Sequence, residues 1–598
     1  MKKLLYILPL ALTLTAGCED FLDSDYLTGK TNENFPATET EATQLIIGIY
    51  SQLLFEDPET SSQYYVAQLA SDDCLGGNLS FSGNCATNFL MYKDNLNIFS
   101  GTWSRCYRMI ARCNNAFETL DNVKSWSSDK MKNRHWGEAY FLRAFAYNEL
   151  VQVFGGVPLR TKSSSENIPR ASVDEIYAVI ASDLQQAISL LPDEIYPAGN
   201  SNEGRITKYA AEAMMARVFL FYTGRYGKSE LPGGINKSQV IEWIDDCVNN
   251  SGHALVTDQR NLWAYTNPAT EENEAGHQYK YVINNNLRWE GNGAIETVFA
   301  NKHKLKGNSW TYTWYSNTVA QFYSPSGDNY SKQDSYPFGS GWGAGPVSPA
   351  MVEEWKKWAS QQSYINGATS DPRLTGSIWS YRAMDPNNAG KVILDRRLDP
   401  DEPDYVVSYR YFEQTGYQQK KYINIHSYHK NQFLPFALQM FPDDDPGLTS
   451  LSLTNIADLI HIRFADVLLM QSELKEDAEG LNKVRARSNL APIGYSLDAI
   501  KTERRWEFAF ESIRWWDLLR WSGPSLEEAG NALNKQTGFT LINAAEIASM
   551  PTFDYKARLQ KTQGYWPIPQ TEIDLSGGLI EQNPGWDASA QFSDWNFM

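Results

Sequence analysis

The stretch RHWGEAYFLRAFAYNELVQVFGGVP, residues 134–158, decides the fold. Small and apolar side chains recur in it at three- and four-residue spacing, and this spacing places on one helix face Ala139, Leu142, Ala146, Leu150 and Val153. Two glycines and a proline close the stretch, a combination that ends helices. The sequence therefore predicts an amphipathic helix with a sharp stop.

Two other segments have the same character, residues 206–226 (ITKYAAEAMMARVFLFYTGRY) and residues 462–474 (IRFADVLLMQSEL). Their alanines allow a neighbouring helix to approach closely. A first helix is expected to begin at Thr38, which forms a capping box with Glu41. We expect a mainly α fold of stacked helical hairpins, similar to tetratricopeptide repeats, although the 34-residue period of those repeats is not kept.

The middle of the chain differs in composition. Residues 255–450 are rich in Gly, Asn, Asp, Ser, Pro and aromatic residues, which predicts loops with short strands. We therefore divide the chain into an N-terminal helical region at 18–254, this loop-rich region, and a C-terminal helical region at 451–598. All three are expected to pack as one compact unit.

The N-terminus has the layout of a secretory signal peptide over residues 1–17, with two lysines before an apolar run from Leu4 to Leu14. The run is too short to cross a bilayer, which takes about 20 apolar residues. The small residues before Cys18 resemble a bacterial lipobox, although Thr15 stands where that pattern prefers leucine. We expect Cys18 to be lipidated and to tether the protein to a membrane.

Charge and cysteine content argue against a nucleic-acid-binding protein and against a disulfide-rich protein. The net charge of -18 and the pI near 5.0 argue against nucleic acid as a partner, because phosphate binding needs a basic surface. Beyond Cys18 five cysteines remain, an odd number that does not encode a disulfide framework. Cys74 with Cys85 is the only pair that we consider.

Aromatic side chains concentrate between Trp310 and Trp342, with ten in 33 residues against a chain average of 13%. In SWTYTWY, residues 309–315, alternation places Trp310, Tyr312 and Trp314 on one face of a strand. Flat rings match the C–H faces of sugars, so this row is a candidate carbohydrate platform. The alternative is that the rings pack a loop-rich subdomain.

The string ERRWEFAFESIRWWDLLRW, residues 503–521, carries three acids and Arg514 on one expected helical stripe, namely Glu503, Glu507, Glu511 and Arg514. Paired carboxylates are the usual machinery of glycoside hydrolases. We reject that interpretation here because arginines share the same helix. Ion pairing is the simpler account.

Five strings in series resemble the SusD/RagB-like outer-membrane lipoproteins of Bacteroidetes. They cover nearly the whole chain after residue 17 and are CEDFLD, EAYFLRAFAYNELVQVFGGVPL, IRFADVLLMQSEL with LNKVRAR, ERRWEFAFESIRWWDLLRW, and YWPIPQTEI with EQNPGW. The resemblance implies helical hairpins under a loop-rich ligand-binding face, and no catalysis. It also implies a lipid anchor on the cell surface, with the acidic residues behind Cys18 as a surface-export signal.

The resemblance further implies a partner and a ligand. Members form the lid of a SusC-type TonB-dependent transporter and capture oligosaccharides, or peptides in RagB-like branches. The segment LASDDCLGGN often lines the site in the family, so the candidate ligand-binding residues are Asp72, Asp73, Asn78, Trp289, Trp310, Tyr312, Trp314 and Trp342.

No cofactor is expected. Acidic runs at 399–404 and 443–445 offer oxygen ligands for a structural Ca²⁺, but neither follows the EF-hand spacing, and solvated turns are the default interpretation. Three functions stay open: a glycan-binding lipoprotein, a peptide-binding relative with apolar pockets, and a glycoside hydrolase. The hydrolase would need two carboxylates facing each other across a cleft.

The lipid anchor is testable with Cys18→Ala. Each buried CH₂ of an acyl chain contributes about 0.8 kcal/mol to membrane binding, so loss of the lipidated residue should release the protein. We expect the variant to leave the outer-membrane fraction after a salt wash, measured by immunoblot. Retention of the variant in washed membranes would contradict the anchor.

Overall fold

The computed structural model describes most of the chain. The described residues are 34–54, 63–75, 97, 99–195, 203–267, 278–304, 315–325, 336–339, 341–388, 390–407, 414–429, 432–435, 455–543, 546–549 and 554–586.

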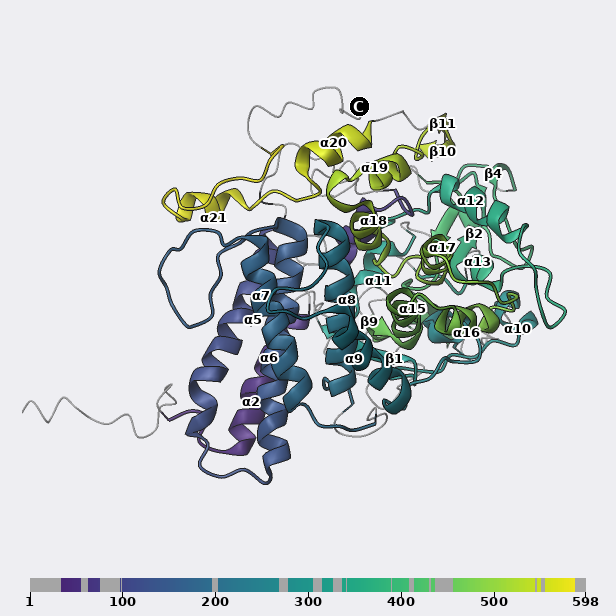
Figure 1. Cartoon of the computed structure of the whole chain (residues 1–598). Helices are drawn as coiled ribbons and strands as arrows, with labels where there is room; N and C mark the ends of the chain where they lie inside the picture. Colours follow the sequence, from purple (N-terminus) through teal and green to yellow (C-terminus); the bar gives the residue numbers. More distant parts are fainter. Residues whose placement is uncertain are drawn as a thin grey trace, which may run out of the picture.

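A bundle of long helices forms one side of the molecule (Figure 1). These helices are α2 (Glu39–Tyr50), α5 (Ser100–Thr119), α6 (Asp129–Phe154), α7 (Val173–Leu190), α8 (Lys208–Tyr226) and α9 (Lys237–Asn250). The eight-residue helix α4 (Gln63–Ala70) is not one of these long helices and packs on α18 (Arg514–Ser522). Helix α6 is the one expected from residues 134–158, and it packs against α5 and α7. It ends at Gly155, whose φ of 70° favours glycine. The expectation of a mainly α fold is confirmed.

Helix starts follow the capping signals of the sequence. The Thr38 side chain accepts a hydrogen bond from the Glu41 backbone N–H at 3.3 Å, as expected for the start of α2. A complete capping box, Ser172 with Glu175, begins α7.

Shorter helices and short strands make up the rest of the molecule. Most of them lie on the side opposite the bundle, but the last helix, α21 (Gln570–Leu575), lies beside one end of the bundle (Figure 1). The helices are α10 (Lys280–Asn284), α11 (Thr318–Tyr323), α12 (Pro349–Ala359), α13 (Pro372–Ser377), α15 (Phe464–Lys475), α16 (Glu479–Arg487), α17 (Leu497–Glu507), α18 (Arg514–Ser522), α19 (Glu527–Leu533), α20 (Tyr555–Thr562) and α21 (Gln570–Leu575). Helix α8 packs on α18, and α9 packs on α15, so these contacts join the two sides.

The strands form small, mostly antiparallel sheets. Their bounds are β1 (Thr297–Asn301), β2 (Ile378–Ser380), β3 (Arg382–Met384), β4 (Val392–Asp395), β5 (Tyr405–Val406), β6 (Tyr417–Gln419), β7 (His426–His429), β8 (Gln432–Pro435), β9 (Leu459–Arg463), β10 (Thr540–Asn543) and β11 (Glu546–Ser549). The pairs are β1 with β9, β2 with β6, β7 with β8 and β10 with β11, and β3 lies between β4 and β5. Strands β1 to β8 fall within residues 255–450, for which the sequence predicts loops with short strands.

Two large apolar cores support this arrangement. One fills the bundle and continues into α15, α18 and the C-terminal segment, while the other lies under the loop-rich region. In the part of the chain that the structure covers, no helix is long and apolar enough to span a membrane.

The expectation of one continuous helix over residues 503–521 is wrong. Helix α17 ends at Glu507 and α18 begins at Arg514, and between them Phe510 and Ser512 have φ values of 66° and 58°. The Glu507 carbonyl accepts three side-chain hydrogen bonds, from Gln259 and Lys421 at 2.9 Å and from Arg463 at 2.8 Å. We attribute the break to these donors, since they satisfy the carbonyl that another helical turn would use.

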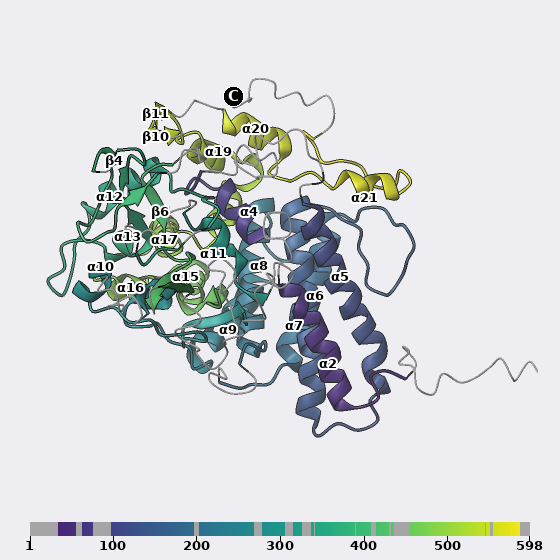
Figure 2. The same cartoon turned by 180° about the vertical axis from the view of Figure 1, so that it is seen from behind.

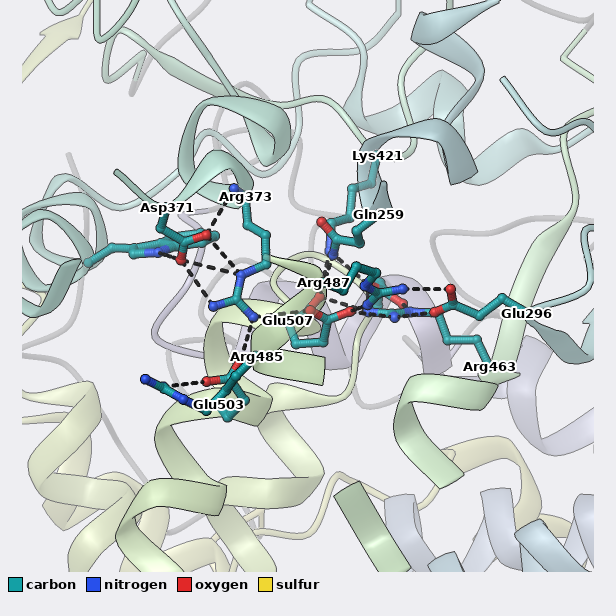
Figure 3. A network of polar contacts seen from close by, with 12 residues as sticks. Gln259, Glu296, Asp371, Arg373, Lys421, Arg463, Arg485, Arg487, Glu503 and Glu507 are labelled. Carbon is teal, nitrogen blue, oxygen red and sulfur yellow. Dashed lines mark hydrogen bonds and ion pairs between the residues drawn. The ribbon is translucent and has the colours of Figure 1, made fainter. Parts of the chain in front are cut away.

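Buried ion pairs surround this helix end (Figure 3). Each side chain of the group is at most 3% exposed, and it comprises five acids and five bases: Glu296, Asp371, Glu503, Glu507 and Glu511 with Arg373, Lys421, Arg463, Arg485 and Arg487. The formal charges cancel. We call this group the Glu507 network.

Glu507 lies at its centre. Its carboxylate accepts from Arg463 at 2.6 Å, from Arg373 at 3.1 Å, and from Arg487. Burial alone raises the pKa of the Glu507 carboxyl, but the guanidiniums of Arg487, Arg463 and Arg373 outweigh it and hold that pKa well below its usual range. The acids of residues 503–521 are ion-paired as expected, but the expected partners are wrong for Glu503, Glu507 and Glu511. Their bases come from outside residues 503–521 and not from the arginines that follow them in sequence.

A second chain of ion pairs continues from α17 toward α18. Arg504 bridges Asp466 at 2.5 Å and Asp517 at 2.8 Å, and Asp517 accepts from Arg520 at 2.7 Å. Arg520 then donates to Glu473 at 2.5 Å. Each of these acids and arginines therefore has an opposite charge as its partner.

The substitution Glu507→Gln tests how much the Glu507 network contributes to the stability of the fold. Removal of one partner leaves a buried charge uncompensated, which costs about 3–5 kcal/mol. We expect a fall of that size in the free energy of unfolding, measured by urea denaturation.

The matched control is Glu479→Gln in α16, which removes an exposed pair with Lys483. That change should cost less than about 1 kcal/mol. Equal losses in the two variants would show that the network does not stabilise the fold.

Candidate ligand-binding face

Trp342 presents its ring at the surface beside α11. The residue is 37% exposed, and its ring packs on Phe322 with 5.0 Å between ring centroids. The Trp342 N–H donates to the Gln321 carbonyl at 2.9 Å, so the backbone lies against α11. A Cβ on Gly341 would collide with the Gln321 carbonyl and the Ser324 side chain, hence only glycine allows this approach.

Distant parts of the sequence meet at this place. Leu75 donates to the Pro346 carbonyl at 2.9 Å, and Ser348 donates to the Asp73 carbonyl at 2.9 Å. Figure 2 shows α4, which leads into this segment, near α11. Backbone bonds therefore hold residues 71–75 against residues 342–348.

Two further segments join the same region. The Gly339 N–H donates to the Asn424 carbonyl at 2.7 Å, and Asn317 donates to the Asn455 carbonyl at 2.6 Å. The Asn424 N–H donates to the Ser324 hydroxyl at 2.6 Å. We call Trp342, with the half-buried Gly341 and Gly343 on either side of it, the Trp342 face; the adjoining residues 317–325 and 344–348 are buried and support it.

The aromatic row lies outside the described residues. Lys304 and Tyr315 flank it, and the Lys304 N–H donates to the Tyr315 carbonyl at 2.8 Å. Lys304 and Tyr315, the two described residues that border this segment, therefore lie next to each other and close to α11. Trp310, Tyr312 and Trp314, with Asn78 and Cys18, remain predictions.

Trp289 contacts a different part of the loop-rich region, residues 262–266. Its indole N–H donates to the Leu262 carbonyl at 3.3 Å, and its backbone N–H donates to the Thr266 carbonyl at 3.0 Å. The half-buried ring borders a small cavity of about 20 Å³ that Lys421 and Tyr422 also line. These contacts give Trp289 a packing role.

Asp72 and Asp73 are buried, 3% and 0% exposed, so the structure does not place them as ligand contacts. Asp72 pairs with Arg514 at 2.8 Å and with Arg505 at 2.9 Å. The Asp73 carboxylate accepts no hydrogen bond within the described ranges, and the nearest ion-pair nitrogen, Arg505 Nε, lies 3.7 Å from it.

The two neighbouring carboxyls have opposite pKa shifts. Burial, followed by the charge of Asp72, raises the pKa of Asp73 to about 7. Burial also acts on Asp72, but Arg505 and Arg514 outweigh it and hold the Asp72 pKa below its usual range. The sequence carried no signal for these partners, because they lie more than 400 residues away.

The residues that the structure describes contain neither a candidate metal site nor a disulfide. Among the described residues no group of three His, Cys, Asp or Glu side chains is placed to hold a metal ion. In the acidic run at 399–404, Asp404 pairs with Arg382 at 2.6 Å and the buried Glu402 pairs with Lys420. The run at 443–445 lies outside the described residues. Cys74 is a free buried thiol, while Cys85 is not described.

Comparison with known sequences finds one family along most of the chain. Residues 20–220 match a family described as starch-binding and associating with the outer membrane, and residues 295–586 match the family described as the SusD family. The SusD-like protein P38 of Formosa agariphila is 23% identical over 551 residues, which cover 86% of this chain and 90% of that protein.

Solved structures share the fold. A laminarin-binding SusD-like protein superposes with a TM-score of 0.64 and 23% identity, over 92% of this chain and 99% of that one. Surface glycan-binding protein A from Bacteroides thetaiotaomicron, in complex with laminarihexaose, gives a TM-score of 0.64 and 20% identity, over 91% and 99% of the two chains.

The opposite pKa shifts of Asp72 and Asp73 predict opposite pH behaviour. The folded-state pKa of Asp73, about 7, lies above its unfolded value of about 3.9, so its stabilising contribution is complete below pH 4 and is lost as the pH rises toward 7. We expect the melting temperature of Asp73→Asn, relative to wild type, to rise from about pH 4 to pH 8.

The matched control is Asp72→Asn. The lowered pKa of Asp72 adds stability above its unfolded value, so this variant should melt below wild type throughout the same pH range. Calorimetric scans across the range measure both variants. A constant difference between Asp73→Asn and wild type would contradict the raised pKa.

Proposed function

Because the chain belongs to the SusD/RagB-like family, we propose that it is a cell-surface lipoprotein that captures oligosaccharides and delivers them to a SusC-type TonB-dependent transporter of the outer membrane. In this proposal Cys18 carries the lipid anchor, and the chain performs no chemistry on the glycan.

The observation that carries the proposal is the exposed Trp342. A sugar ring offers a flat C–H face to an aromatic ring, and stacking of that kind needs an indole that is both exposed and held in place. Phe322 and the backbone bonds to α11 hold Trp342 without covering it. We propose Trp310, Tyr312 and Trp314 as further ligand contacts, as the sequence predicts.

The acids of residues 503–521 support a binding role over hydrolysis. A glycosidase needs two carboxyl groups that reach the scissile bond, one of them able to give up a proton. Glu503, Glu507 and Glu511 are buried and each pairs with arginine or lysine. They therefore have structural partners and no access to substrate.

The related structures suggest the first ligand to test. Two of them are named for laminarin or laminarihexaose, so a β-glucan oligosaccharide of that kind is the first choice. Starch oligosaccharides follow, because one matching family is described as starch-binding.

Isothermal titration calorimetry tests the function. We expect the mature chain without its lipid to bind one glycan of a panel led by laminarihexaose, and Trp342→Ala to weaken that binding at least tenfold. Stacking on an aromatic ring is worth about 0.5–1.5 kcal/mol beyond the buried area, and loss of that area adds to the effect. Trp310→Ala and Trp314→Ala are expected to act in the same direction.

The matched control is Trp243→Ala on α9, a half-buried tryptophan away from the Trp342 face, which should leave affinity unchanged. Circular dichroism checks that every variant folds. Binding of peptides and not of glycans would move the protein to the RagB-like alternative, and release of reducing sugar would contradict a purely binding role. Failure of a TonB-dependent barrel to co-purify from solubilised membranes would contradict the transporter partnership.

A further inference from the structure

Trp342 belongs to a short segment, residues 341–344, that pairs with residues 321–325 at the end of α11. Backbone hydrogen bonds of 2.8–2.9 Å join the two segments, and they run from the N–H groups of Gly341, Trp342, Gly343 and Ala344 to the carbonyls of Pro325, Gln321, Ser324 and Phe322, in that order. The two segments therefore form one unit, and the Trp342 ring is its exposed part.

The side chain of Gln418 connects this unit to strand β6 (Figure 2). Gln418 is 4% exposed, and its Nε2 donates to two carbonyls, that of Tyr323, the last residue of α11, and that of Ala344 at 3.1 Å. Carbonyl oxygens only accept hydrogen bonds, so the nitrogen of the amide and not its oxygen faces them. The amide thus makes one hydrogen bond to each of the two segments.

Strand β6 is itself fixed in the apolar core under the loop-rich region. It pairs with β2, where Gln418 lies opposite the buried Trp379. The Val347 N–H donates to the Tyr417 carbonyl at 3.0 Å, and the Thr415 hydroxyl donates to the Val347 carbonyl at 2.8 Å. Gln418 therefore extends from a well-anchored strand to the unit that carries Trp342.

Such an anchor matters for a ring that stacks on a ligand. A side chain or loop that is loose in the free protein loses conformational entropy on binding, whereas a rigid one has already lost it on folding. Phe322 supports the Trp342 ring from below, and Gln418 fixes the backbone on which both rings stand. Both N–H bonds of the Gln418 amide are used inside the protein, so its nitrogen has none to offer to a ligand.

We propose that Gln418 is a positioning residue for the glycan contact Trp342. Its amide holds the Tyr323 and Ala344 carbonyls together, and the exposed ring is thereby presented in one orientation before a ligand arrives. This inference rests on the proposed glycan-binding function, because it names the buried group that keeps one of its contacts in place. Gln418 acts on affinity through Trp342 and does not touch the ligand.

The substitution Gln418→Met tests this role, because methionine has a similar length and lacks both N–H donors. The matched control is Gln419→Met in the same strand. Gln419 is also buried, but the alternation of the strand turns its side chain to the opposite face, where it bonds the Tyr422 backbone at 2.9 and 3.0 Å. Each variant loses two hydrogen bonds, so a purely structural effect should be similar in the two.

The first measurement needs no ligand. Fluorine NMR of the mature chain labelled with 5-fluorotryptophan identifies the Trp342 signal as the one that is missing from Trp342→Phe. We expect Gln418→Met to shift or broaden this signal and Gln419→Met to leave it as in wild type. An unchanged Trp342 signal in folded Gln418→Met would overturn the proposal.

The second measurement is calorimetry with the glycan that wild type binds. Gln418→Met should weaken binding about fivefold, the scale of ordering one side chain at an interface, while Gln419→Met leaves the affinity unchanged. In the Trp342→Ala background, Gln418→Met should cause no further loss, because the ring that it positions is absent. Equal losses with and without Trp342 would contradict a role through that ring.

Two provisions keep the result interpretable. Gln418→Asn keeps the amide but shortens the side chain by one methylene, so it should cause the same changes to a smaller degree, and it covers the case in which Gln418→Met does not fold. If wild type binds no glycan, the fluorine spectra still decide whether Gln418 positions Trp342. Failure of the proposed function and failure of this inference are therefore distinguishable.

Discussion

The ion pair between Arg463 and Glu507 connects strand β9 to helix α17 at the centre of the Glu507 network. Arg463 ends β9 and Glu507 ends α17, and both side chains are almost fully buried. Neither charge is tolerable alone at that depth, because the loss of hydration costs several kcal/mol for each ion. The charges of the network balance only when α13, α16, α17 and Lys421 come together, so charge neutrality constrains how these segments assemble (Figure 3).

The break after Glu507 has consequences beyond the network. Once α17 ends there, α18 starts in a new direction and brings Arg514 to Asp72, while the Ser512 N–H donates to Gln68 of α4 at 3.1 Å. Asp73 and Leu75 follow Asp72 in the chain and pair with the segment that carries Trp342. A continuous series of contacts thus runs from the buried ion pairs to the proposed glycan-binding surface.

This organisation separates stability from recognition. The acids of residues 503–521 are buried in the interior, whereas the exposed Trp342 ring, which we propose as a ligand contact, lies on the loop-rich side. Asp371, Arg373 and Lys421 belong to that loop-rich side and take part in the Glu507 network.

The sequence alone determined the long helix of residues 134–158 and the start of the first helix, since the spacing of apolar residues and the cap at Thr38 are local signals. It also indicated that the acids of residues 503–521 are structural, because arginines stood beside them. The tertiary structure decided where the helix broke and which candidate residues face solvent. Asp72 and Asp73 looked like loop residues, but their partners Arg505 and Arg514 lie more than 400 residues away in the chain. Periodicity reports only neighbours along the chain, whereas the burial of a charge depends on contacts that form when distant segments pack together.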